Sequence, residues 1–188
     1  MSHIETLLTV ETLQAIFRDT FFDSYNTELI GGADEPLYQP ATEQYPHHRL
    51  YFREDYISSA FHEIAHWCIA GEARRQLLDF GYWYQPDGRS AEQQRTFESV
   101  EVKPQAVEWH LSEAAGHRFH LSADNLSGES IDEEAGSSER FAEAVIKQAQ
   151  DYCQQGLPPR AKMLADALRN FFGSGETSLP DRYIGERL

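Results

Sequence analysis

The sequence predicts an α+β fold in which several helices pack with a small β-sheet. Apolar residues recur at helical spacing near the N-terminus and again in the C-terminal half. Between these regions, the segments 26–41 and 48–54 have the composition of short strands and turns. The chain has 188 residues, 40% of them hydrophobic. We therefore expect one domain, 1–188, with a substantial core.

Local signals mark the elements before residue 72. A helix is expected over residues 9–25, with Thr9 as its N-cap. Its apolar face is made by Leu13, Ile16, Phe17 and Phe21. The strand over 48–54 leads into a second helix, expected from about 55 to 70 and ended by Gly71. The two helices therefore flank a short β-region.

The C-terminal half is expected to be mainly helical. Ser90 and Gln93 have the spacing of a capping box, so a helix should begin there. Pro104 either kinks this helix or begins a new one. Two further helices are expected over about 139–155 and 159–172.

Two segments outside these helices are expected to be irregular. Residues 122–139 contain six Asp and Glu residues and no Lys or Arg. This composition is typical of a solvated, flexible loop. Residues 174–188 are expected to form a C-terminal tail.

The charge of the chain indicates which partners suit it. The net charge is −15 and the pI is about 4.8. Nucleic-acid-binding faces need Lys and Arg, so direct contact with nucleic acid is not expected. An acidic surface suits a cationic substrate or a basic partner, although acidity also aids solubility.

Other features predict a cytoplasmic protein. No run of 18 apolar residues is present, so no membrane-spanning helix is expected. The N-terminal residues include acids and no basic region, unlike a signal peptide. The two cysteines, Cys68 and Cys153, do not make a disulfide framework, which suits a reducing compartment.

The stretch FHEIAHWCIAG, residues 61–71, contains the pattern His62-Glu63-x-x-His66. Residues four apart lie on the same face of a helix, so both imidazoles can bind one metal ion. Glu63 is turned by about 100° and lies beside the metal. In zinc peptidases with this pattern, the glutamate activates a metal-bound water. The motif therefore predicts a metal site, with Glu63 as the candidate catalytic residue.

Two carboxylates are candidates for a third ligand. Glu98 and Glu101 are three residues apart on the second ligand-bearing helix and can face the same side. One would bind the metal while the other orients a ligand histidine. Analogy with zinc peptidases that use a glutamate ligand favours Glu98. Two histidines and one carboxylate also form the ligand set of non-haem Fe(II) oxygenases, so ligand type does not separate zinc from iron.

The loop between the two ligand-bearing helices is aromatic. We expect it near the metal, shaping the substrate entrance, with ordinary packing as the alternative; its residues are Tyr82, Trp83 and Tyr84. His117 and His120 are weaker candidates for metal binding. Three further histidines are expected to be polar surface residues: His47, His48 and His110.

The sequence resembles the elongation factor P hydroxylase family in three stretches: NTELIGGADEPLYQPA, FHEIAHWCIAGEARRQLLDFGYWYQPDGR and FESVEVKPQAVEW. The resemblance runs from about residue 10 to 172, and the long middle stretch is very specific. The acidic segment and the tail carry little of it. The metal motif of the family maps onto His62 and His66, with a carboxylate from Glu98 or Glu101.

The resemblance implies an enzyme that hydroxylates a lysine of translation elongation factor P after a β-lysine has been attached to it. It implies a divalent metal, with Fe(II) expected, and O2 as co-substrate; the reducing co-substrate stays open. It also implies a small mixed sheet with helices, similar to a bacterial metal-dependent endoribonuclease. The implied partner, β-lysylated elongation factor P, agrees with a cytoplasmic location.

Three other functions are compatible with the metal motif. A zinc metallopeptidase would use Glu63 as its general base. A metal-dependent ribonuclease would share the fold, but the acidic composition disfavours it. A non-enzymatic module would bind only a metal or a translation factor.

Overall fold

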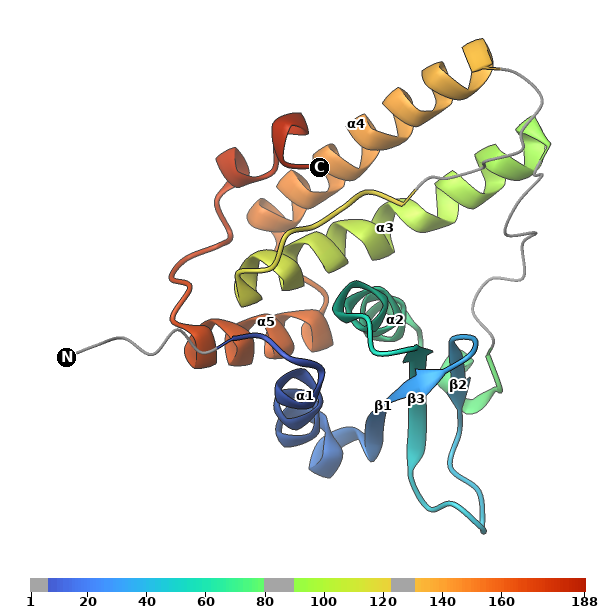
Figure 1. The fold of residues 1–188 in the computed structure, drawn as a ribbon, viewed down its shortest axis with the longest axis vertical. Helices are drawn as coiled ribbons and strands as arrows, with labels where there is room; N and C mark the ends of the chain where they lie inside the picture. Colours follow the sequence, from blue (N-terminus) through green and yellow to red (C-terminus); the bar gives the residue numbers. More distant parts are fainter. Residues whose placement is uncertain (1–6, 80–89, 123–130) are drawn as a thin grey trace.

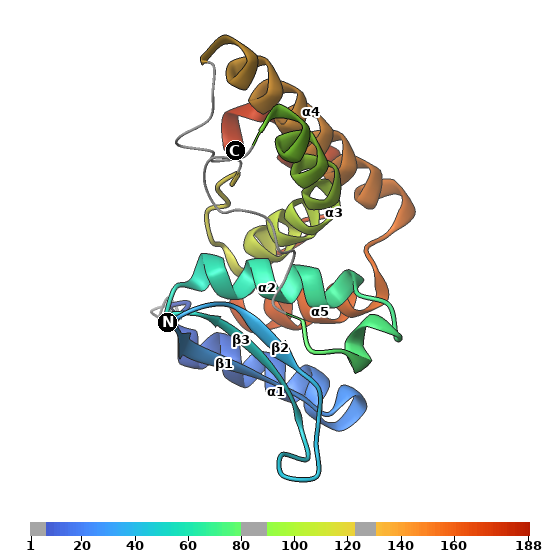
Figure 2. The same ribbon diagram turned by 90° about the vertical axis from the view of Figure 1, so that its right-hand side faces the viewer.

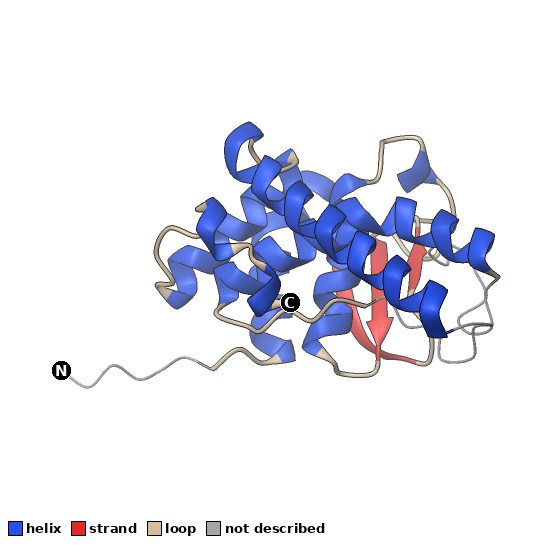
Figure 3. Ribbon diagram, turned by 90° about the horizontal axis from the view of Figure 1, so that it is seen from above, coloured by secondary structure: helices blue, strands red, loops and turns tan. Residues whose placement is uncertain are grey.

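The computed structural model describes residues 7–79, 90–122 and 131–188 and confirms the predicted α+β class. The three strands are gathered in one part of the molecule, and helices make up most of the rest (Figure 1, Figure 3). The elements follow in the order α1 (Val10–Tyr25), β1 (Thr27–Ala33), β2 (Leu37–Gln39), β3 (His48–Arg53), α2 (Ile57–Ile69), η1 (Arg74–Gln76), α3 (Ala91–Ala115), α4 (Ile131–Gln155), α5 (Pro159–Phe172), η2 (Pro180–Arg182) and η3 (Gly185–Arg187).

The sheet is mixed, as the family resemblance implied. Its order is β1-β3-β2, with β3 parallel to β1 and antiparallel to β2. The β1–β3 register shifts between Ile30 and Ala33, at Gly31 and Gly32. Gly32 has a φ of 79°, and a Cβ on Gly31 would lie 2.8 Å from Phe52 Cζ. This irregularity therefore depends on glycine.

Helix α2 lies between the sheet and α3, near the middle of the molecule (Figure 1, Figure 2). α1 packs along β1, while α5 lies against α1, α2 and α3. Their apolar side chains meet in one core that includes the fully buried Phe17, Phe61, Ile64 and Leu164. Packing on both sides of α2 fixes its rotation, and so fixes where its polar side chains point.

Two predicted helix starts are confirmed. Thr9 accepts a hydrogen bond from the Thr12 N–H. Ser90 and Gln93 form the predicted capping box. α3 then runs without interruption through Pro104, so no new helix begins there. One continuous helix therefore carries both candidate carboxylates.

α2 ends slightly earlier than predicted, with Ala70 rather than Gly71 as its C-cap. Arg160 of α5 donates hydrogen bonds to the carbonyls of Trp67 and Ala70, at 2.9 and 2.5 Å. The carbonyls at a helix end need such partners. A side chain distant in sequence therefore completes this end of the motif helix.

Two expectations about irregular segments need correction. Helix α4 already begins at Ile131, so part of the expected loop over 122–139 is helical, because acids are as favourable in a first helical turn as in a loop. Residues 123–130 of that loop lie outside the described residues. The expected tail over 174–188 includes η2 and η3 and the fully buried Tyr183, whose ring centroid is 5.1 Å from that of Trp109. Among the described helices, none has the length and apolar character needed to cross a membrane.

Candidate metal centre

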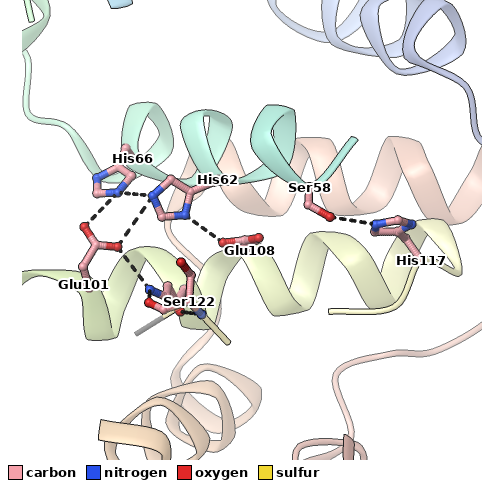
Figure 4. A network of polar contacts seen from close by, with 8 residues as sticks. Ser58, His62, His66, Glu101, Glu108, His117 and Ser122 are labelled. Atoms are coloured by element: carbon pink, nitrogen blue, oxygen red, sulfur yellow. Dashed lines mark hydrogen bonds and ion pairs between the residues drawn. The ribbon is translucent and has the colours of Figure 1, made fainter. Parts of the chain in front are cut away.

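Three side chains from two facing helices converge in the polar network of Figure 4. His62 and His66 lie one turn apart on α2, and Glu101 lies on α3. The Nε2 atoms of the two histidines are 3.1 Å apart. His66 Nε2 lies 3.2 Å from Glu101 Oε1, and His62 Nε2 lies 3.7 Å from Glu101 Oε2. The helix presents both histidines to one point, as their spacing predicted.

This triangle has the size and the donors that a divalent metal ion needs. Ligand atoms bound to one ion at about 2.0–2.2 Å lie about 3–3.5 Å apart, which agrees with the two shorter edges. Two neutral imidazoles that face each other through Nε2 repel unless a cation or proton lies between them. Glu101 Oε1 is buried and accepts no hydrogen bond of normal geometry from the described residues. A cation would satisfy all three groups at once.

Glu108 of α3 orients His62. Its Oε2 lies 3.0 Å from His62 Nδ1, so Nδ1–H donates to the carboxylate and Nε2 keeps a lone pair for an ion. Burial alone would lower the pKa of His62. The hydrogen bond and charge of Glu108, with the charges of Glu63 and Glu101, nevertheless raise that pKa to about 10. The site thus attracts a proton, which a metal ion would have to displace.

Glu101 is almost completely buried, yet its surroundings favour the ionised form. Burial raises its pKa, but hydrogen bonding and the charges of His66 and His62 lower the pKa below the usual value. Gln105 Nε2 lies 3.4 Å from Glu101 Oε2 and donates to the Ser122 carbonyl at 2.8 Å. The Ser122 N–H in turn donates to Gln105 Oε1 at 3.0 Å. These contacts hold the carboxylate in one orientation.

Glu98, the carboxylate favoured from the sequence, is not part of this cluster. Its Oε1 accepts a hydrogen bond from Gln94 Nε2 at 3.0 Å. Positions three apart on a helix differ by about 60° around the axis, and the packing of α3 on α2 decides which position faces the histidines. Among the described residues, Glu101 rather than Glu98 is the carboxylate that lies with His62 and His66. Which of the two binds a metal stays a prediction, and this placement favours Glu101.

Glu63 lies beside the cluster, on the wall of a cavity of about 240 Å³. His66 and Trp67 of α2 and Tyr38 of β2 line the same cavity. Burial raises the pKa of Glu63, against the opposing charges of His62 and His66. The structure thus places Glu63 next to a space that a small molecule can fill. Its catalytic role stays a prediction.

Other sequence candidates lie outside the described residues or outside the cluster. The expected substrate-entrance residues belong to the part that is not described: Tyr82, Trp83 and Tyr84. His117 Nε2 lies 3.2 Å from the Ser58 hydroxyl (Figure 4), and His120 is exposed. Neither histidine belongs to the group that converges on α2 and α3.

His110 was expected at the surface, and this prediction is wrong. It is 1% exposed, and its Nε2–H donates to the Ala149 carbonyl at 2.9 Å. Its Nδ1 lies 2.6 Å from the Tyr183 hydroxyl. Burial lowers the pKa of His110 to about 4. The reason is that α4 and the C-terminal segment cover this side of α3. His47 and His48 remain partly exposed.

Glu108 was missed from the sequence. Glu101, Gln105 and Glu108 occupy positions i, i+4 and i+7 of α3, which form one stripe along a helix. All three are buried. A polar stripe within a segment otherwise rich in Ala, Val, Trp and Leu is the signal that could have identified Glu108.

Comparison with known proteins covers the whole cluster. The sequence matches a family described as elongation factor P hydroxylase over residues 16–181. It is 51% identical over 165 residues to a Haemophilus influenzae protein named elongation factor P lysine hydroxylase. That similarity covers 88% of this chain and 90% of the relative.

Proposed function

This chain belongs to the elongation factor P hydroxylase family, and on that premise we propose that it hydroxylates a lysine of translation elongation factor P. The observation that carries the proposal is the convergence of His62, His66 and Glu101. Two histidines and one carboxylate are the ligand set with which non-haem iron enzymes bind their metal.

We propose that these three residues hold a divalent ion, with Fe(II) as the physiological metal. When bound, such a redox-active ion supplies activation of O2 at its open positions. Glu108 accepts the Nδ1–H of His62 and so keeps Nε2 directed at the ion. Gln105 restrains the Glu101 carboxylate from the other side. The chain's own contribution is therefore a rigid set of ligands.

We propose that the substrate is the β-lysylated form of elongation factor P. A β-lysyl-lysine side chain carries two ammonium groups, and the net charge of −15 favours its approach. The carboxylate of Glu63 lies beside the proposed ligands, where it can bind an ammonium group or accept a proton. Because the partner is a translation factor, we propose the cytoplasm as the place of action.

Insertion of one oxygen atom from O2 into a C–H bond leaves the second oxygen atom to be reduced. Its release as water needs two electrons and two protons, so the reaction requires a reducing co-substrate. None of the ligand residues can be consumed for this purpose in each turnover. The co-substrate must therefore bind close to the cluster.

The decisive experiment measures the mass of elongation factor P. The protein is purified under argon, loaded with Fe(II), and mixed with β-lysylated elongation factor P and a reductant, with and without O2. A gain equal to one oxygen atom, only when O2 is present, supports the function. Unmodified elongation factor P together with oxygen-independent peptide cleavage would favour a zinc peptidase instead.

A further inference from the structure

The cavity beside Glu63 extends from the cluster of candidate metal ligands, His62, His66 and Glu101, to two arginines. Glu63 lies in the middle of α2 and His66 in its last turn, whereas Arg74 and Arg75 follow its C-terminus in η1. All four line the same cavity. The helix rises about 10 Å between residues 63 and 70. The cavity therefore has His66, from the cluster of candidate metal ligands, at one end and the arginines at the other.

The two arginines differ in how their charges are compensated. Arg74 Nε lies 2.5 Å from Asp79 Oδ2. Arg75 makes no ion pair with any acid in the described ranges, and its buried Nε has no hydrogen-bond partner. Its guanidinium carbon lies 5.7 Å from the centroid of the Tyr25 ring, a distant contact. A guanidinium with donors left over is a binding group for an anionic oxygen.

Neighbouring groups respond to the uncompensated charge of Arg75. Burial, followed by the charge of Arg75, lowers the pKa of His48. The same two causes, in the same order, lower the pKa of Arg160. This end of the cavity is thus electropositive, although the whole chain carries a net charge of −15.

We propose that this cavity binds a small molecule that carries a carboxylate, with the carboxylate held by Arg75. The remainder of the molecule extends toward His66 between the side chains of Tyr38, Leu50 and Trp67, which suit a short carbon chain. At about 30 Å³ per water molecule, the volume of about 240 Å³ equals about eight waters. A folded partner cannot enter, and a lysyl ammonium at this end would face an unpaired guanidinium.

The position of the site next to the cluster gives the bound molecule a role. Under the proposed function, it is the reducing co-substrate that supplies the two electrons and two protons for the second oxygen atom. This assignment rests on the proposed function. The binding of a carboxylate to Arg75 does not.

The experiment measures binding, independently of turnover. The metal-loaded protein is titrated under argon with succinate, with 2-oxoglutarate and, as a cation of similar length, with 1,5-diaminopentane. Calorimetry gives the affinity, and tryptophan emission reports occupancy because Trp67 lines the cavity. Arg75→Gln removes the charge, and Arg75→Lys keeps it without the planar pair of donors. Arg53→Gln is the control, because Arg53 is exposed and lies on β3.

We expect at least one dicarboxylate to bind the wild type. Its affinity should fall at least about tenfold in Arg75→Gln, less in Arg75→Lys, and not at all in Arg53→Gln. Absence of carboxylate binding to the wild type overturns the proposal. The proposal is also overturned if both Arg75 variants bind the dicarboxylate as tightly as the wild type does, or if the wild type prefers the diamine. Thermal melts identify a variant that fails to fold, in which case Arg75→Lys decides.

A parallel hydroxylation assay separates this proposal from the proposed function. If elongation factor P gains oxygen equally well in wild type and Arg75→Gln, the cavity does not hold the co-substrate, while the function stands. If carboxylates bind through Arg75 but elongation factor P is never hydroxylated with any reductant, the function fails and the binding site stands.

Discussion

Two polar clusters that contain histidine lie on two sides of helix α3, and their hydrogen bonding differs. On the side facing α2, His62 and His66 direct their Nε2 atoms at each other and at Glu101. On the side facing α4, His110 donates from Nε2 to a carbonyl of α4 and has the Tyr183 hydroxyl at Nδ1. The second cluster is complete within the protein. The first has the ligand atoms that a metal ion could bind.

The pKa values of the two clusters shift in opposite directions. His62 is partly buried among carboxylates, chiefly Glu108, that raise its pKa to about 10 although burial alone would lower it. Burial and, to a smaller extent, the charge of Arg169 lower the pKa of His110 to about 4, and the hydrogen-bond partners of His110 are neutral groups. Helical position therefore does not distinguish a candidate ligand histidine from a structural one. The charge of its partners does.

The largest expected effect on metal affinity is the loss of one histidine from the first cluster. His66→Ala removes one of two imidazoles, and we expect metal affinity to fall at least about a hundredfold. Equilibrium dialysis followed by elemental analysis measures this. His120→Ala, at an exposed position, should keep wild-type affinity. Full metal occupancy in His66→Ala would show that the cation binds elsewhere.

The two carboxylates of α3 that the sequence offered as ligands, Glu98 and Glu101, should differ in their effect on metal affinity. Glu101→Gln keeps the shape but removes the charge beside the histidines, and should weaken metal binding about a hundredfold. Glu98→Gln should leave the affinity within about twofold, since Glu98 lies outside the cluster. The same dialysis on both variants decides. A reversed order would restore Glu98 as the ligand.

Replacing Glu108 by a neutral residue should leave His62, like His110, with a neutral hydrogen-bond partner. Glu108→Gln should weaken metal binding about 10–100-fold, the usual cost of losing a group that orients a ligand. In the wild type the pKa of His62 is about 10, so metal must displace a proton at neutral pH. Affinity should therefore rise about tenfold per pH unit from 6 to 8. In the variant this rise should level off at lower pH, and competition with a chelator at several pH values measures it.

The second cluster should control acid stability instead. His110 has a pKa of about 4, below its ordinary 6.5, so the unfolded chain binds the proton more tightly. The stabilisation is fully present above pH 6.5 and is lost as the pH falls toward 4, by on the order of 3 kcal/mol. Urea unfolding between pH 7.5 and 4.5 tests this. In His110→Gln the contribution to this slope should disappear, whereas metal affinity at pH 7.5 should not change.

Local signals predicted much of the fold. The Thr9 cap and the Ser90–Gln93 capping box depend on residues within one turn, so the sequence contains them fully. The convergence of His62 and His66 was predictable for the same reason, because a spacing of four is a property of one helix. Which carboxylate meets them depends on the rotation of α3 against α2, and this is decided by packing between distant segments.

The errors share this cause. His110 lies in an apolar stretch, but its burial depends on α4 and on Tyr183, which is 73 residues away. The C-terminal segment lacks periodicity, yet it contributes that one buried ring. Arg75 is another example: only the structure shows that it lines the same cavity as Glu63 and His66. Contacts between distant segments leave no periodic pattern in the sequence.

Only a small effect on metal binding is expected at Glu63, but this residue distinguishes two chemistries for the first cluster. Glu63→Gln keeps the size of the side chain and removes its basicity. In a peptidase, this glutamate takes the proton of the attacking water, so the variant should lose nearly all activity, and the wild type should work under argon with zinc.

In a hydroxylase, activated O2 attacks the substrate and no water needs deprotonation. Glu63→Gln should then bind metal within about threefold of the wild type and keep O2-dependent hydroxylation, with a higher KM if Glu63 holds an ammonium group. Mass spectrometry of elongation factor P with and without O2 tests this. Oxygen-independent peptide cleavage that disappears in Glu63→Gln would assign the first cluster to hydrolysis.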